Sequence, residues 1–168
     1  MNFYIKMIIP QWLSTISFVN TYAVLWSAME VEIEGVDGGW AKNLPTELCL
    51  GTNFTWYHVI MNSIVGLSLS YSLRDRKLSE VVFYTANWFL VEDFMWFMLN
   101  KGFGWNNYTQ EAIWWHESQP WYLGIPLHNY IGLGVMGVSS YVANNKDLVK
   151  SALFSGATIL GGILYGMW

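Results

Sequence analysis

The residues whose types and spacing suggest chemistry are acids and histidines placed within or beside long apolar stretches. Glu92 and Asp93 are adjacent inside the stretch 79–99, about seven residues before its end, and that stretch contains no Lys or Arg. A charged side chain inside a membrane helix costs about 2.5–3.5 kcal/mol on insertion scales, so such acids face the bundle and find partners. The two carboxylates therefore require protons, hydrogen-bond donors or a bound metal ion.

Further ionisable residues stand where helix ends would influence them. Glu30 and Glu34 are one helical turn apart at the end of the first apolar stretch, where the helix dipole disfavours carboxylates. His58 and His128 stand near the starts of two other stretches, where the dipole favours the neutral imidazole that binds metals. We therefore predict the metal ligands His58, Glu92, Asp93 and His128, with His116 or Glu34 as a further ligand or general base.

A mixed set of imidazole and carboxylate donors suits Zn²⁺, Fe²⁺ or Mn²⁺. An alternative interpretation is a haem b held by His58 and His128 from two helices, which would bring the acids close to the macrocycle. The chain contains no zincin H-E-x-x-H pattern, since residue 120 is Pro, and it contains no G-x-S-x-G turn. No motif therefore defines the reaction, and we expect either a hydrolase or an oxidoreductase acting on a lipid-like substrate.

Composition indicates a membrane protein. Of the 168 residues, 54% are hydrophobic and only 12% are charged, against about 25% charged residues in an average soluble domain. The net charge of −4 argues against nucleic acid as a partner, because phosphate binding needs clustered Lys and Arg. The single cysteine, Cys49, excludes an internal disulfide.

The elements that must position the acids and histidines are five apolar stretches, each about long enough to cross the hydrocarbon core as a helix. We predict an all-α bundle of five transmembrane helices in a single domain, with outer connections at 30–54 and 100–126. Pro10 and Pro126 stand at helix entries, and Gly35 can end the first helix. The predicted spans are Gln11–Met29, Thr55–Leu73, Ser79–Leu99, Leu127–Ala143 and Leu148–Trp168.

Charge asymmetry predicts the orientation of these spans. With the N-terminus in the cytoplasm and the C-terminus outside, six of the eight basic residues lie inside, namely Lys6, Arg74, Arg76, Lys77, Lys146 and Lys150. All three histidines then lie toward the outer side, together with most of the acids. We expect them to meet in one layer beneath the outer connections, with a short helix over 109–117 placing His116 across the end of the bundle.

Other features concern partners and modification. The protein is expected in the cell membrane as a multi-pass protein in contact with lipids, either as a homo-oligomer or in a larger membrane complex. A non-catalytic accessory subunit of such a complex is the alternative to an enzyme. Gly162 and Gly166 form a G-x-x-x-G pair that permits close helix contact, within the chain or between copies. Asn53 and Asn107 begin N-x-T triplets on the predicted outer side.

A resemblance adds to this interpretation. The stretch Glu92–Asn100, which begins Glu-Asp-Phe-x-Trp-Phe, accompanies Glu34-Gly35, the segment 39–46, Tyr57-His58 and Trp115-His116. In these residues the chain resembles a group of small, uncharacterised, multi-span prokaryotic membrane proteins over about Glu30–Tyr130. The resemblance implies the same fold class and a self-contained module, and it transfers no role to any residue.

Overall fold

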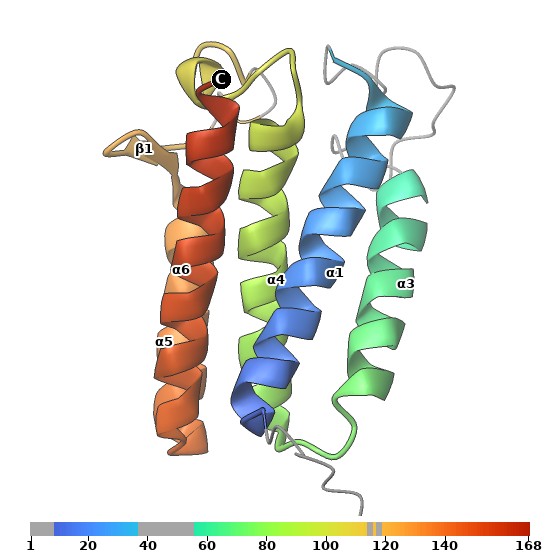
Figure 1. The fold of residues 1–168 in the computed structure, drawn as a ribbon, viewed down its shortest axis with the longest axis vertical. Helices are drawn as coiled ribbons and strands as arrows, with labels where there is room; N and C mark the ends of the chain where they lie inside the picture. The colour runs from blue at the N-terminus through green and yellow to red at the C-terminus, as the bar shows by residue number, and fades with distance from the viewer. Residues whose placement is uncertain (1–8, 37–55, 114–115, 117–118) are drawn as a thin grey trace, which may run out of the picture.

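The computed structural model describes residues 9–36, 56–113, 116 and 119–168, and these form an upright helical bundle with a small hairpin at one end (Figure 1). The described elements are α1 (Gln11–Glu34), α3 (Trp56–Ser72), α4 (Leu78–Leu99), the 3₁₀ turn η1 (Trp105–Asn107), β1 (Trp121–Tyr122), β2 (Ile125–Pro126), α5 (Leu127–Ala143) and α6 (Lys146–Gly166).

The five α-helices of the described residues confirm the predicted all-α class. Their bounds lie within two residues of the predicted stretches, except that α1 continues five residues beyond the predicted end at Met29. Pro10 and Pro126 directly precede α1 and α5, and Gly35 ends α1 with a φ of 78°, which a residue with a side chain rarely adopts. Asn144 ends α5 in the left-handed conformation, and the side chain of Asn145 accepts a hydrogen bond from the backbone N–H of Asp147 to cap α6. Local signals therefore set these boundaries.

Membrane insertion is a separate matter from helix formation. Judged by length and composition, one of the described helices, α6, qualifies as a membrane-crossing segment. The helices α3 and α5 have 17 residues each, and α1 and α4 carry carboxylates near their ends. The structure thus supports five helices, whereas five crossings remain a prediction.

The helix α4 is the centre of the bundle. It packs most extensively against α1, α5 and α6 and least against α3, and successive helices run in alternating directions (Figure 1). The ends of α1, α4 and α6 and the starts of α3 and α5 therefore lie at the same end of the bundle. Twelve of the 22 residues of α4 are buried, including Phe83, Trp88 and Val91.

A polar network joins three helices in the middle of the bundle. The Asn20 side chain on α1 donates to Thr158 on α6 at 3.0 Å, and its carbonyl accepts from Asn87 on α4 at 2.9 Å and from Ser155 at 3.1 Å. Asn20, Asn87 and Ser155 are all buried. Since buried polar groups need partners, this network favours one arrangement of α1, α4 and α6.

The glycine pair of α6 faces α4 within the same chain. A methyl group built on Gly162 would lie 2.4 Å from Met95 Sδ, and one on Gly166 would lie 3.2 Å from both the carbonyl oxygen and Sδ of Met98. Of the two alternatives left by the sequence, contact within the chain is therefore the one observed. The absence of side chains at these two positions allows α6 to approach the central helix closely.

Candidate metal centre

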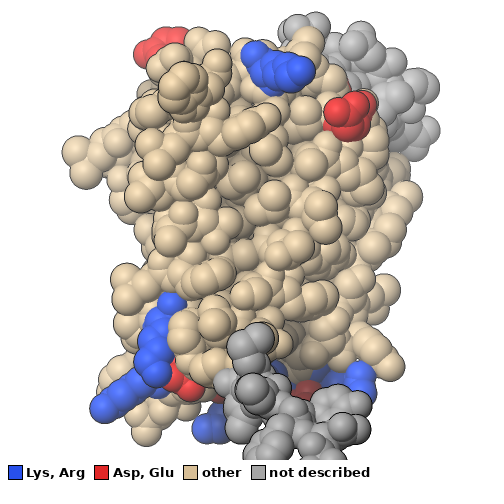
Figure 2. Space-filling view, in the orientation of Figure 1, with Lys and Arg blue, Asp and Glu red and all other residues tan. Residues whose placement is uncertain are grey.

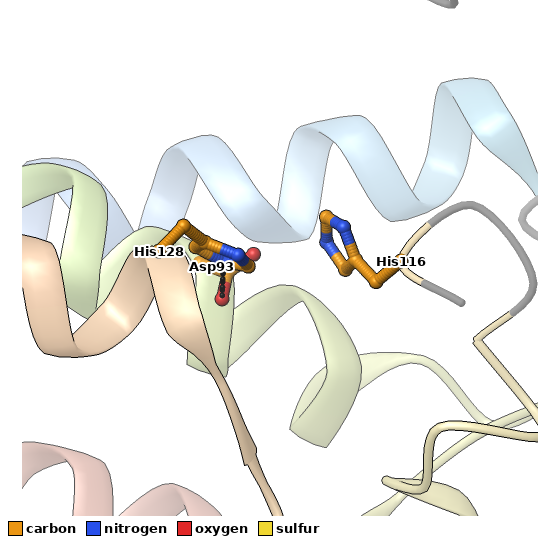
Figure 3. Close-up of side chains that lie close together, drawn as sticks. All are labelled: Asp93, His116 and His128. Atoms are coloured by element: carbon orange, nitrogen blue, oxygen red, sulfur yellow. Dashed lines mark hydrogen bonds and ion pairs between the residues drawn. The ribbon is translucent and has the colours of Figure 1, made fainter. Parts of the chain in front are cut away.

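Three of the predicted site residues converge at the end of the bundle that carries the hairpin. Asp93 is on α4, His128 is the second residue of α5, and His116 lies in the connection between them (Figure 3). One ligand atom from each residue lies within 4.8 Å of the others, and all three side chains are half-buried. Two nitrogen or oxygen ligands of a tetrahedral zinc ion lie about 3.4 Å apart, so side-chain movements of about 1.4 Å would close the group.

The contacts within this group form a chain of polar atoms. His128 Nε2 lies 3.2 Å from Asp93 Oδ2, while His128 Nδ1 lies 2.9 Å from Gln119 Oε1. The other end of the Gln119 amide, Nε2, lies 2.7 Å from His116 Nδ1. The two imidazole rings are 4.6 Å apart between centroids. Gln119 therefore bridges the two histidines.

Proton placement shows what the Asp93–His128 contact requires. Because Gln119 Oε1 only accepts, the proton of a neutral His128 is on Nδ1, and Nε2 then presents its lone pair to the Asp93 carboxylate. Two lone pairs at 3.2 Å repel each other unless a cation stands between them. Either a second proton, giving an ion pair, or a metal ion satisfies this contact.

The connection that carries His116 is held by its backbone. The carbonyl oxygen of His116 accepts from the backbone N–H of Gln119 at 3.2 Å and from Trp121 Nε1 at 3.1 Å. The backbone N–H of Leu127 donates to the carbonyl of Pro120, which joins this segment to the start of α5. Where we predicted a short helix over 109–117, residues 109–112 form a bend and turns and His116 has 3₁₀ conformation, while 114, 115 and 117 lie outside the described residues. His116 is thus positioned by these bonds.

The aromatic side chains of Tyr108 and Phe94 lie beside the group. Tyr108 stacks on Phe94 and accepts a hydrogen bond from Asn129 at 3.1 Å. Burial, and then the nearby Asp93 carboxylate, raise the pKa of Tyr108, so this residue stays neutral. Burial lowers the pKa of His116, and the neighbouring His128 lowers it further against the opposing effect of Asp93. Both groups therefore face the site in their uncharged forms.

The other predicted acids lie on the α1 side of α4. Glu92 interacts with Glu30 through a hydrogen bond between their carboxyl groups, and Trp26 Nε1 donates to Glu30 at 3.1 Å. Glu34, the last residue of α1 and beyond the predicted span Gln11–Met29, interacts with Trp96 and Tyr57. Burial and then Glu30 raise the pKa of Glu34 to about 8. The structure thus divides five of the six predicted site residues between two groups.

His58 lies on α3, outside both groups. It is the third residue of α3, its ring contacts Tyr57, and its side chain is half-buried. The helices α3 and α5 lie on opposite sides of α1 and α4 (Figure 1), so the structure does not bring His58 and His128 together as the haem interpretation requires. Among the described residues, the group able to hold a metal comprises Asp93, His116 and His128.

Two imidazoles and one carboxylate are a common donor set for catalytic metals. Three protein ligands with an open position are found in zinc hydrolases, and two histidines with one carboxylate are found in non-haem iron oxygenases. The side chains of His128 and Asp93 are 37% and 22% exposed, so the group is accessible to a further ligand. The arrangement can therefore support hydrolytic or oxidative chemistry.

Gln119 is the residue of this site that sequence reasoning missed. It is an amide in an irregular connection, with no periodicity to mark it, and its only signal is its place between two histidines three and nine residues away. Comparison with known proteins adds no assignment, because no family model, curated protein or solved structure matches the chain.

Proposed function

We propose that this chain is a small multi-pass membrane protein that binds a divalent metal ion, Zn²⁺, Fe²⁺ or Mn²⁺, near its extracytoplasmic end. Asp93 and His128 provide ligands, His116 lies beside the ion as a further ligand or as a general base, and the reaction is hydrolysis or oxidation of a lipid-like substrate. The observation that carries the proposal is the convergence of three donor side chains from α4, α5 and the connection between them within 4.8 Å.

Apolar exposure supports a membrane environment. Large hydrophobic side chains are exposed on all five helices. Large exposed apolar patches on a protein mark surfaces that contact a membrane or another protein. Leu67, for example, is 74% exposed and Leu153 is 72% exposed. Lipid would cover these side chains at no cost. They include Phe18 and Leu25 on α1, Ile60, Ile64 and Leu67 on α3, Phe89 on α4, Ile131 and Val138 on α5, and Leu153 and Leu160 on α6.

The distribution of charge supports the same environment. Figure 2 shows Lys and Arg gathered mainly at the lower end of the molecule and acids at both ends, with a broad band of other residues between them. No charged residue occurs in α3, in α5 or in α6 beyond Lys150. A band without charges between two charged ends matches the hydrocarbon core and its two interfaces.

The location of the metal group supports an amphiphilic substrate. The group lies at the end of the bundle opposite the basic α3–α4 connection and the basic first turns of α6, which positive-inside asymmetry assigns to the cytoplasm. The nearby hairpin exposes Tyr122 and the whole of Leu123. A molecule with an acyl chain in the lipid and a polar headgroup at the interface would meet both this apolar hairpin and the polar group.

The chemistry follows from the donor set. A divalent metal lowers the pKa of a bound water toward neutrality and polarises a carbonyl or phosphoryl oxygen. Asp93 and His128 would hold the ion, and the neutral Tyr108, stacked on Phe94, lies near Asp93. A neutral His116 beside the ion is suited to exchange a proton or donate a hydrogen bond.

Metal analysis of untagged protein purified in detergent tests the proposal. We expect about one Zn, Fe or Mn per chain in the wild type and less than a tenth of that in Asp93→Asn and His128→Gln, since each substitution removes a ligand. Glu92→Gln is the matched control, because the adjacent carboxyl group contacts Glu30 instead. This variant should retain the metal.

Two results would overturn the proposal. One is wild-type protein that holds no metal after incubation with stoichiometric Zn²⁺, Fe²⁺ or Mn²⁺, and the other is equal metal content in Asp93→Asn and Glu92→Gln. A metal-free chain that co-purifies with other subunits in a defined ratio would favour the accessory-subunit alternative.

A further inference from the structure

The amide group of Gln119 contacts both histidines of the metal group. Its Oε1 lies 3.3 Å from the backbone nitrogen of His128 and 2.9 Å from the Nδ1 of that residue, and its Nε2 lies 2.7 Å from His116 Nδ1. A backbone N–H can only donate, so the amide atom that faces it must be the oxygen. The orientation of the amide is therefore defined by a donor whose proton is not in question.

The orientation of the amide assigns a proton to one nitrogen of each ring. His128 Nδ1 must carry a proton to donate to Oε1, which leaves the lone pair of Nε2 facing Asp93. Gln119 Nε2 only donates, so His116 Nδ1 must offer a lone pair, and the proton of the neutral ring is on Nε2. One amide thus holds the two neighbouring imidazoles in opposite tautomers.

We propose that Gln119 is a positioning residue that makes His128 a metal ligand through Nε2 and keeps His116 as an N–H donor beside the metal rather than a third ligand. The inference rests on the proposed function. A ring nitrogen that carries a proton cannot bind a metal, and the only lone pair of His116 is used by the Gln119 amide.

This assignment narrows the class of substrate. An N–H donor next to a metal with an open position is placed to hydrogen-bond an oxygen atom on which negative charge develops. Ester carbonyl and phosphoryl groups have such an oxygen, and the exposed hairpin residues Tyr122 and Leu123 suit the apolar part of a lipid ester or phospholipid. The pairing of one imidazole ligand with one imidazole donor therefore favours the hydrolytic form of the proposed function.

Nuclear magnetic resonance of the full chain with ¹⁵N-labelled histidine tests the tautomers directly. The chain has three histidines, and His58→Gln and His116→Gln assign their signals. In the neutral state we expect His116 to show the Nε2–H tautomer. On addition of Zn²⁺, His128 should show the Nδ1–H tautomer with a shifted Nε2, while His116 keeps its metal-free pattern.

Gln119→Glu should increase the affinity for Zn²⁺, which a merely structural role of Gln119 would not produce. A carboxylate accepts from both rings, so His116 should change to the Nδ1–H tautomer and its freed Nε2 should join the metal. We expect the Kd for Zn²⁺ to fall by about tenfold or more, the size of effect typical of changes next to metal ligands. Asn106→Asp, an added charge at an exposed position of the same connection, should leave the His116 tautomer and the Kd unchanged.

An Nδ1–H tautomer of His116 in the wild type, or a Zn²⁺-shifted His116 signal, would overturn the inference. Failure of the wild type to bind Zn²⁺ would instead overturn the proposed function. In that case the metal-free spectra still decide whether Gln119 sets the His116 tautomer, so the two failures are distinguishable.

Discussion

Adding a side chain at Gly162 should separate α6 from the central helix. A Cβ at this position would lie 2.4 Å from Met95 Sδ and 3.7 Å from Met98 Cβ, whereas a Cβ at the adjacent Gly161 meets nothing within 4 Å. Leucine at position 162 must displace Met95 or shift α6, and overpacking of this kind costs about 1–3 kcal/mol. The gain in helix propensity, up to about 1 kcal/mol, is common to Gly162→Leu and Gly161→Leu and cancels between them.

The assay is equilibrium unfolding of the purified protein in mixed micelles, followed by circular dichroism. We expect Gly162→Leu to be less stable than Gly161→Leu by about 1–3 kcal/mol. Truncating the opposing side chain should relieve the clash, so Met95→Ala should cost less in the Gly162→Leu background than in the wild type. Equal stability of the two leucine variants, or strict additivity with Met95→Ala, would refute the packing argument.

Three further predictions follow from the same structure. Asn20→Ala should lower the free energy of unfolding by about 2–4 kcal/mol in the same assay, more than Thr158→Val, because it leaves Asn87 and Ser155 without a shared partner. The pKa of Glu34 is raised from 4.5 to about 8, so its protonation stabilises the folded state. This contribution to the free energy of unfolding should be fully present below pH 4.5 and should be lost as the pH rises through 8. In Glu34→Gln, unfolding measured across the same pH range should not show this loss. Ile64→Arg, midway along α3, should reduce membrane insertion in a translocation assay by the equivalent of about 2.5–3.5 kcal/mol. Tyr71→Arg, near the end of the same helix, should have a much smaller effect. Equal effects of the two substitutions would contradict a membrane-crossing α3.

The helices were predictable because their signals are local. A long apolar stretch with few charges forms a helix wherever its backbone must satisfy its own hydrogen bonds, and Pro126 and Asn144 mark the ends of α5 in the sequence. Membrane insertion was predictable only as a tendency, since tryptophans and carboxylates reduce the apolar character of α1 and α4. The contacts of α3 could not be predicted from the sequence, because a helix that packs loosely has no periodic pattern of buried residues.

The candidate site was predictable in its residue types and only partly in its membership. Asp93 and His128 were expected together, and they are in contact. His116 was expected beside them on a short helix, and it does lie there. What the sequence did not predict is that hydrogen bonds of an irregular connection hold it in place, because no periodicity reveals such bonds. Gln119 is part of the site for the same reason. Irregular segments derive their shape from individual hydrogen bonds, so their contribution to a site emerges only in three dimensions.

The separation of Glu92 from Asp93 has a geometric cause that applies to any adjacent pair on a buried helix. Successive residues are rotated by about 100° around the helix axis, so two neighbouring carboxylates on a central helix face different partners. Glu92 faces Glu30 on α1, and Asp93 faces His128 on α5. The acid pair that suggested one pocket therefore serves two groups, with α4 as their shared wall. Substituting Glu92 should leave the metal in place, which is why the Glu92→Gln and Asp93→Asn pair separates the role of the metal group from a general need for buried acids in this bundle.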